Sequence, residues 1–231
     1  MPNQYLNWSI IFSALFFLFS PISTVTAQQR LDLGVVGGPE VNFVGSEPRQ
    51  SELSRIQTIG EAGTAVGYFL GAYLEYEVLG GLYVRGGLNY SRKRYSYAVS
   101  RGLPERGDVS YGQNRIVYTA IEVPLAILYR FPYLPNNDRF LVGLGGVADR
   151  WVGDPQVKTD FLPGSADRSY IREAHRSVNF FIGYDHYLSD RFVIGIEPYL
   201  SYSPTEFLFE TETISANRVQ GGIAVRIRFD N

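Results

Sequence analysis

The chain of 231 residues contains no cysteine. Disulfide bonds, thiolate metal centres and the lipid-modified cysteine that anchors bacterial lipoproteins are therefore excluded. The formal net charge is only −2, and the charges form no basic patch, so the sequence predicts no nucleic-acid partner. Only two histidines are present and no glycine-rich loop opens a predicted helix, so the sequence predicts no metal and no other cofactor.

Long hydrophobic runs are also scarce. The run at residues 10–20 (IIFSALFFLFS) is too short to cross a bilayer as a helix, and a small-residue cleavage pattern follows it at residues 25–27. We therefore expect residues 1–27 to be a cleaved secretory signal peptide and residues 28–231 to form one domain. Residues 1–8 carry no lysine or arginine, so an uncleaved membrane anchor stays open as an alternative.

The remainder of the chain alternates apolar and polar residues. Residues 218–229 (RVQGGIAVRIRF) place valine, isoleucine or phenylalanine at nearly every odd position, and arginines at three even positions. Successive side chains of a strand point to opposite faces, so this pattern fits a barrel wall with lipid outside and a polar interior. The mean hydropathy near zero agrees, because barrel strands carry their apolar face in every second residue.

Eight alternating segments are bounded by turn residues, near 31–44, 65–78, 82–95, 114–130, 139–151, 173–187, 191–203 and 214–229. The connections at 79–81, 131–138 and 188–190 are short, whereas those at 45–64, 96–113, 152–172 and 204–213 are long and polar. This rhythm predicts an all-β, eight-stranded antiparallel up-and-down transmembrane β-barrel with short periplasmic turns and four external loops. Outward aromatic residues near the short turns predict a periplasmic girdle, namely Tyr129, Phe131, Phe140, Phe192 and Phe229.

The opposite side of the predicted strands carries acids and bases in similar numbers. A barrel of eight strands is only wide enough for side chains to fill, so these groups should pair in an ion network that leaves no open channel. The residues predicted for this structural network in the lumen are Glu75, Arg85, Glu122, Arg130, Glu197, Arg226 and Arg228. A solvated face of a soluble sandwich or lipocalin-like barrel is the alternative interpretation of the same charges.

Proline and glycine punctuate the predicted strands. A proline cannot donate to a sheet ladder, so Pro39, Pro124 and Pro198 should each mark a bulge or a misplaced strand boundary. Glycine pairs recur at 37–38, 86–87, 145–146 and 221–222, where a small, strongly curved barrel needs residues without a side chain.

Two segments resemble a known family. Residues 119–131 (TAIEVPLAILYRF) resemble the "EIPLLLKYRF" strand of PorT-like outer-membrane β-barrels, with Val123 in place of the usual isoleucine, and residues 66–95 resemble the glycine-rich hairpin of that family. The resemblance implies an eight-stranded barrel in a Gram-negative outer membrane and, for the member that names the family, a part in protein secretion. The chain departs from the pattern at its end, because the last aromatic residue, Phe229, is followed by two further residues.

Catalytic residues are few. His175 and Ser177 lie on one face of a predicted strand, as do the histidine and serine of barrels that deacylate lipid A, so a lipid A or phospholipid hydrolase is one alternative. His175 and His186 would face opposite sides of a strand, which argues against a shared metal site. The sequence favours a non-enzymatic structural or interaction protein that contacts outer-membrane lipids and, through its loops or turns, envelope or secretion proteins. A soluble secreted barrel that binds an apolar ligand is the second alternative.

Overall fold

The computed structural model describes residues 31–46, 56–57, 62–103, 108–132, 134, 138–159, 174–189, 191–203, 206–209 and 212–229. The strands are β1 (Leu31–Ser46), β2 (Ile56–Gln57), β3 (Ala62–Leu79), β4 (Leu82–Leu103), β5 (Asp108–Arg130), β6 (Arg139–Thr159), β7 (Ala174–Ser189), β8 (Phe192–Ser203), β9 (Glu206–Phe209) and β10 (Glu212–Phe229). No helix in the described part of the chain is long and apolar enough to cross a membrane. The predicted signal peptide lies outside the described residues.

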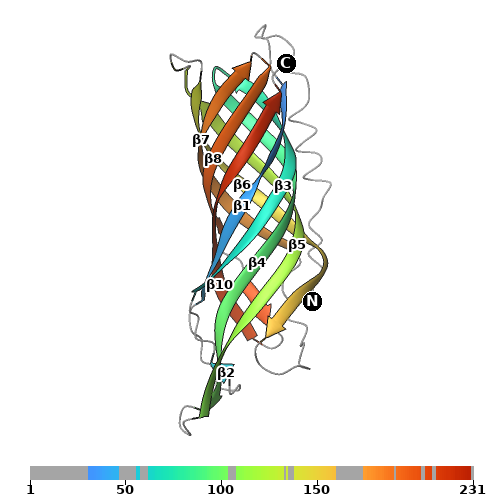
Figure 1. Ribbon diagram of the computed structural model, residues 1–231, viewed down its shortest axis with the longest axis vertical. Coiled ribbons are helices and arrows are strands. Elements are labelled where there is room, and N and C mark those ends of the chain that lie inside the picture. The colour runs from blue at the N-terminus through green and yellow to red at the C-terminus, as the bar shows by residue number, and fades with distance from the viewer. Residues whose placement is uncertain are drawn as a thin grey trace, which may run out of the picture.

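The eight long strands close into an antiparallel barrel. Each pairs with the next long strand along the chain, and β1 pairs with β10 from Leu33↔Phe229 to Ser46↔Ala216, which completes the ring. The short strands β2 and β9 pair with the far parts of β4 and β10. Figure 1 shows the strands tilted about the long axis, with the arrowhead of β10 at one end and β2 at the other. The predicted fold class is confirmed.

We call the end with the β3–β4, β5–β6 and β7–β8 connections the inner end, and the opposite end the outer end. Each predicted strand corresponds to one barrel strand, but the prediction of a long loop at 96–113 is wrong. Strands β4 and β5 continue beyond the predicted ends and pair as far as Leu103↔Asp108, and β6 continues to Thr159. A strand outside a bilayer needs no apolar face, so the alternation that revealed the barrel does not reveal these extensions.

The apolar side of the strands faces outward. On β10, Ile223 and Phe229 are 51% and 48% exposed, whereas Arg226 and Arg228 are each 1% exposed. The same inversion holds around the barrel, where the exposed apolar residues include Leu33, Leu70, Leu74, Leu88, Leu125, Ile127, Leu144, Val178, Phe180, Ile182, Ile196 and Leu200. A closed barrel with an apolar exterior and a charged interior is solvated on the outside by lipid, so this barrel spans a membrane. A soluble sandwich or soluble barrel would require a polar exterior, and both are excluded.

Aromatic side chains gather where the barrel meets its inner turns. Tyr129 and Phe131 pack edge to face with ring centroids 5.2 Å apart, and Phe192 and Phe229 do so at 5.6 Å. Phe140, which is half exposed, packs against Tyr184. These rings form the girdle expected at a membrane interface, where an aromatic ring contacts both acyl chains and headgroups.

Each of the three strand prolines interrupts one ladder and keeps the other. Pro39 pairs with Tyr68 of β3, but the pairing of β1 with β10 skips from Gly37 to Glu40. Pro124 likewise breaks the β4–β5 ladder, and Pro198 breaks the β7–β8 ladder. A proline lacks the N–H that would be donated to one neighbouring strand, so the break falls on one side only. The register is the same on both sides of each break, so the expectation of a bulge or a misplaced strand boundary at these prolines is wrong.

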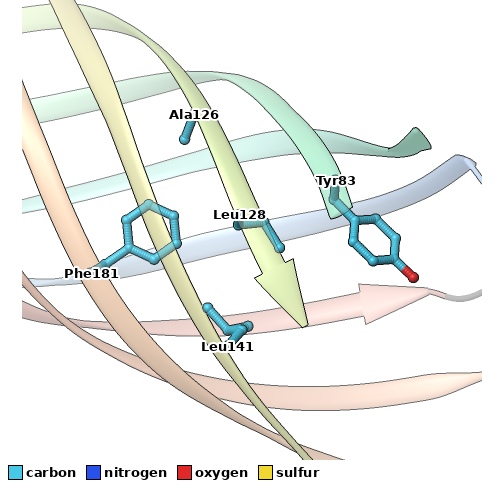
Figure 2. Packing of buried hydrophobic residues seen from close by; sticks show 5 residues of the cluster. All are labelled: Tyr83, Ala126, Leu128, Leu141 and Phe181. Carbon is cyan, nitrogen blue, oxygen red and sulfur yellow. The ribbon is translucent and has the colours of Figure 1, made fainter. Parts of the chain in front are cut away.

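The buried hydrophobic side chains point into the lumen, away from the exposed apolar side chains on the outer surface of the barrel. Figure 2 shows Tyr83, Ala126, Leu128, Leu141 and Phe181, which β4, β5, β6 and β7 contribute to one side of the lumen. The buried charged residues come from every long strand, including Arg85 on β4, Arg130 on β5 and Asp185 on β7. Apolar and charged groups are in contact within the lumen, where the guanidinium of Arg130 lies 4.2 Å from the ring centroid of Tyr83.

Candidate functional site

Glu75 lies at the centre of an ion cluster near the inner end of the lumen. Its side chain is 0% exposed, and its Oε1 lies 2.6 Å from Nε of Arg85 and 3.4 Å from Nη1 of Arg226. Its Oε2 accepts a hydrogen bond from Arg130 and lies 3.9 Å from Nη1 of Arg228. One carboxylate from β3 therefore meets arginines from β4, β5 and β10, which ties strands together across the lumen.

Three further acids complete this inner ion cluster. Glu197 receives both terminal nitrogens of Arg85 at 2.8 Å, in a bidentate pair. Asp185 lies 2.5 Å from Nη2 of Arg226 and 2.9 Å from Nη1 of Arg228, and Asp32 lies 3.5 Å from Nη1 of Arg130. The inner ion cluster consists of Asp32, Glu75, Asp185, Glu197, Arg85, Arg130, Arg226 and Arg228. Among the described residues its charges balance, four against four, and bidentate geometry makes such pairs strong.

A second polar cluster lies nearer the outer end. Nζ of Lys93 lies 2.6 Å from Oε1 of Glu122, 3.5 Å from Oε2 of Glu40 and 3.3 Å from Oε1 of Gln220. On the outer side of Lys93 lie the side chains of Tyr95 and Tyr118. Arg218 donates hydrogen bonds to the hydroxyls of Tyr118 at 2.8 Å and Tyr95 at 3.2 Å. We call this the outer cluster, and its members are Glu40, Lys93, Tyr95, Tyr118, Glu122, Asp149, Trp151, His175, Arg218 and Gln220.

Aromatic rings stack along one side of the outer cluster. The rings of Tyr95 and Tyr118 lie 5.8 Å apart and nearly parallel, and Trp151 lies 4.5 Å from Tyr118. His175 continues the row at 5.7 Å from Trp151, and its backbone N–H donates to Asp149 at 2.9 Å. The row therefore runs from β4 across β5 and β6 to β7, at the level where Arg218 enters from β10.

A chamber of about 100 Å³ separates the two clusters. Its lining combines the polar residues Glu40, Asn89, Lys93, Glu122 and Gln220 with Ala126, Phe181 and Tyr199. The expectation that side chains fill the whole lumen is therefore wrong at this level. Small inward residues contribute to the difference, because Gly145 and Ala224 line the chamber.

The structure brings six of the seven residues predicted for the lumen together in the inner ion cluster, and places Glu122 in the outer cluster with Lys93. The sequence placed Arg218 on the inward face of its strand, but Asp32, Glu40, Lys93 and Asp149 were not predicted as members. A signal for several of them was present, since Lys93 is an even number of residues from Arg85 and must face the same side of β4.

The two histidines face opposite sides of β7, as the sequence predicts. The side chain of His186 is 54% exposed and its Nδ1 lies 3.0 Å from Oδ1 of Asp138, whereas His175 is 2% exposed inside the barrel. No group of three or more potential metal-ligating residues occurs in the described ranges. Ser177 lines the chamber, so it and His175 face the lumen rather than the lipid.

Comparisons with known proteins find likeness in structure alone. No protein-family model matches the chain, and no match is found among curated proteins. The outer membrane protein OprG of Pseudomonas aeruginosa is 11% identical, with a TM-score of 0.46 over 90% of this chain and 99% of that one. Neisserial surface protein A is 13% identical, with a TM-score of 0.44 over 84% and 96% of the two chains. Ail of Yersinia pestis, solved with the heparin analogue sucrose octasulfate, is 12% identical, with a TM-score of 0.33 over 86% and 99%.

The assignment to a membrane class follows from this chain's own geometry. A closed antiparallel barrel of an even number of strands, with short turns at one end, an apolar belt and an aromatic girdle, is the architecture of outer-membrane β-barrels. The protein is an outer-membrane β-barrel with a polar lumen.

Proposed function

We propose that this barrel is a non-conducting structural or interaction protein of the Gram-negative outer membrane, exported by a signal peptide at residues 1–27. The observation that carries the proposal is the inner ion cluster, which crosses the lumen with eight side chains that are each at most 10% exposed. A lumen occupied by paired charges provides no water-filled path for solutes, in contrast to the wide polar channel of a porin.

The resemblance to PorT-like barrels supports a role in secretion or envelope assembly. The segment 119–131 that carries the resemblance includes the inner half of β5, and residues 66–95 cover the β3–β4 hairpin. In this chain Glu122 pairs with Lys93, and Pro124 lies at a break in the β4–β5 ladder, so the shared residues serve the barrel wall and the lumen. Their contacts do not indicate catalysis.

Partners would meet the barrel at its two ends. At the outer end the β4–β5 hairpin extends as far as Leu103↔Asp108, and β2 pairs alongside it through Ile56↔Arg101. At the inner end the β3–β4 turn presents Leu79, which is 73% exposed. The belt between them contacts outer-membrane lipid. A protein that neither conducts nor catalyses has these two ends available for envelope or secretion proteins.

Site-specific photo-crosslinking in intact cells tests this proposal. A photoreactive amino acid is placed at Val109 on the outer hairpin, at Leu79 on the inner turn, and at the lipid-facing control Leu88, which is 58% exposed. We expect a discrete protein adduct from Val109 or Leu79 and only lipid adducts from Leu88. Identical products at all three positions, or no protein adduct at either end, would contradict an interaction role.

The hydrolase alternative is less well supported. His175 and Ser177 face the lumen, and Asp149 lies beside them, but the acyl chains of a lipid contact the outer surface of the barrel. We expect neither the native protein nor Ser177→Ala to release fatty acid from lipid A in mixed micelles. Release by the native protein that the substitution abolishes would establish the enzymatic alternative in place of our proposal.

A further inference from the structure

A group of arginines lies on the outer surface of the barrel, towards its outer end. Arg92 stands between Ser91 and Lys93, and Arg150 follows Asp149, and these three neighbours are buried in the lumen. Successive side chains of a strand point to opposite faces, so the arginines face away from the lumen. We call the group the arginine arc, and its members are Arg92 and Arg94 on β4, Arg115 on β5, Arg150 on β6 and Arg176 on β7. Arg92 is half-buried and the others are exposed.

The arginine arc lies at the level of the outer membrane interface. Arg92 is ten residues along β4 from Leu82, and Arg150 is ten residues along β6 from Phe140, so both are counted from the inner turns. A tilted strand of ten residues rises about 25 Å, which is the height of the apolar band of an outer-membrane barrel. The guanidinium groups therefore lie where the headgroups of the outer leaflet begin.

The arginine arc has no partner of its own in the part of the chain that the structure describes. None of its members forms a salt bridge or a side-chain hydrogen bond there. The acids nearest to it, Glu122 and Asp149, face the lumen and are at most 8% exposed. A guanidinium carries five N–H donors and no acceptor, so these exposed side chains are available to an anion from outside the protein.

The arginine arc covers one side of the barrel only. At the same level the strands of the other side carry Phe43, Tyr68, Tyr202 and Val219 on their outer surface. Tyr68 pairs with Arg92, so an aromatic residue marks the edge of the arc on β3. Arginines that merely anchor a barrel at an interface would be spread around its circumference. Their restriction to β4, β5, β6 and β7 among the described strands indicates a local binding surface.

The strand register brings members of the arginine arc close together. Thr119 of β5 lies directly opposite Arg92 of β4, and Arg150 of β6 is the diagonal neighbour of Thr119. Arg115 is likewise the diagonal neighbour of Arg94. Diagonal neighbours on one face of a sheet are about 8 Å apart, which long side chains can bridge, and like charges so placed repel each other. An anion held between the arginines would relieve that repulsion.

We propose that the arginine arc binds the phosphate groups of one lipid A molecule of the outer leaflet. One phosphate lies between Arg92 and Arg150, beside the hydroxyl of Thr119, and the second is within reach of Arg94 and Arg115. A planar guanidinium matches the geometry of a phosphate through two parallel hydrogen bonds. The acyl chains of the same molecule would pack against the apolar belt below the arc. The site rests on the outer-membrane location of the barrel and holds whether or not the barrel has a protein partner.

Native mass spectrometry of the barrel in micelles of a non-ionic detergent tests the ligand. Diphosphoryl lipid A, monophosphoryl lipid A and phosphatidylglycerol are added at equal mole fractions. We expect one diphosphoryl lipid A per barrel, bound about tenfold more tightly than phosphatidylglycerol, because the second phosphate adds charge-assisted hydrogen bonds. Monophosphoryl lipid A should fall between them. Equal retention of phosphatidylglycerol would show attraction by charge alone, and displacement by inorganic phosphate at the concentration of the lipid would show a site for free phosphate. Either result would overturn the proposal.

Substitution by lysine separates a phosphate site from a general positive charge. The double substitution of Arg92→Lys and Arg150→Lys keeps the charge and removes the two-pronged donors, so the preference for diphosphoryl lipid A should fall about tenfold. Arg191→Lys is the matched control, because Arg191 is exposed at the inner turn, on the opposite side of the membrane. All three side chains are on the surface, so the variants should fold as the native barrel does. An unchanged preference in the double variant, or an equal loss in Arg191→Lys, would refute the assignment.

Discussion

Replacement of Glu75 by glutamine tests the inner ion cluster most directly. The substitution preserves the shape of the side chain and removes one negative charge, so four arginines would face three carboxylates. Glu75 is completely buried and lies within 4 Å of Arg85, Arg130, Arg226 and Arg228. Unit charges about 4 Å apart interact by about 4 kcal/mol at an effective dielectric constant near 20.

The expected cost of Glu75→Gln is about 3–5 kcal/mol in the free energy of unfolding, since loss of one partner leaves an uncompensated buried charge. The upper part of that range applies because several arginines share this one carboxylate. Urea titration of the refolded barrel, followed by the fluorescence of Trp151, measures the change. The cost should appear as a lower midpoint with little change in slope, because the exposed surface area on unfolding is the same.

Glu77→Gln is the matched control. Glu77 lies two residues further along β3, where Oε1 accepts a hydrogen bond from the backbone N–H of Gly81 at 3.0 Å. A glutamine oxygen can accept the same bond, so the free energy of unfolding should change by no more than about 0.5 kcal/mol. Equal midpoints for the two variants would refute the view that Glu75 neutralises the arginines of the lumen.

Three further outcomes are expected. Because the chain has no native cysteine, spin labels can be placed singly, and a label at Ile223→Cys should contact acyl chains in vesicles whereas a label at Ala224→Cys should not; equal contact would contradict the barrel register. The double substitution of Tyr95→Ala and Tyr118→Ala should produce no stable conductance in planar bilayers, since the inner ion cluster still crosses the lumen, and a channel would show that the phenols alone close it. The hydroxyl of Tyr184 and the backbone N–H of Tyr187 hydrogen-bond Asp138 and lower the pKa of its carboxyl, so this contribution to stability is complete above pH 3.8 and is lost as the pH falls through the lower folded-state pKa. Asp138→Asn should therefore flatten the acid-induced fall in the urea midpoint below pH 3.8, and an unchanged pH profile would disprove this role.

The barrel strands were predictable because lipid imposes a strict rule on them. Every second residue must be apolar across the bilayer, so β10 could be recognised from residues 218–229 alone. The inward position of Arg226 and Arg228 follows from the same alternation of side chains along the strand. Outside the bilayer the rule no longer applies, which is why the extensions of β4, β5 and β6 were predicted as loops.

The partners within the lumen were not predictable to the same degree. The alternation of side chains along β4 places Arg85 inside the barrel. Its bidentate contact with Glu197, 112 residues further along the chain, depends also on the stagger of the strands. A shift of two residues in one ladder would preserve every inward position and change every partner. The breaks at Pro39, Pro124 and Pro198 interrupt a ladder without such a shift, because the register is the same on both sides of each.

The chamber has the same physical origin as the closure of this narrow barrel. Neighbouring backbones approach closely at mid-height, so a Cβ added at Gly222 would lie 2.5 Å from the carbonyl oxygen of Pro39, and one at Gly87 would lie 2.8 Å from that of Ala72. Large side chains are thereby excluded from these inward positions, and the ionic groups are confined to the levels above and below. The small inward residues that allow the strands to approach also leave room at this height, where Gly145 and Ala224 line the chamber.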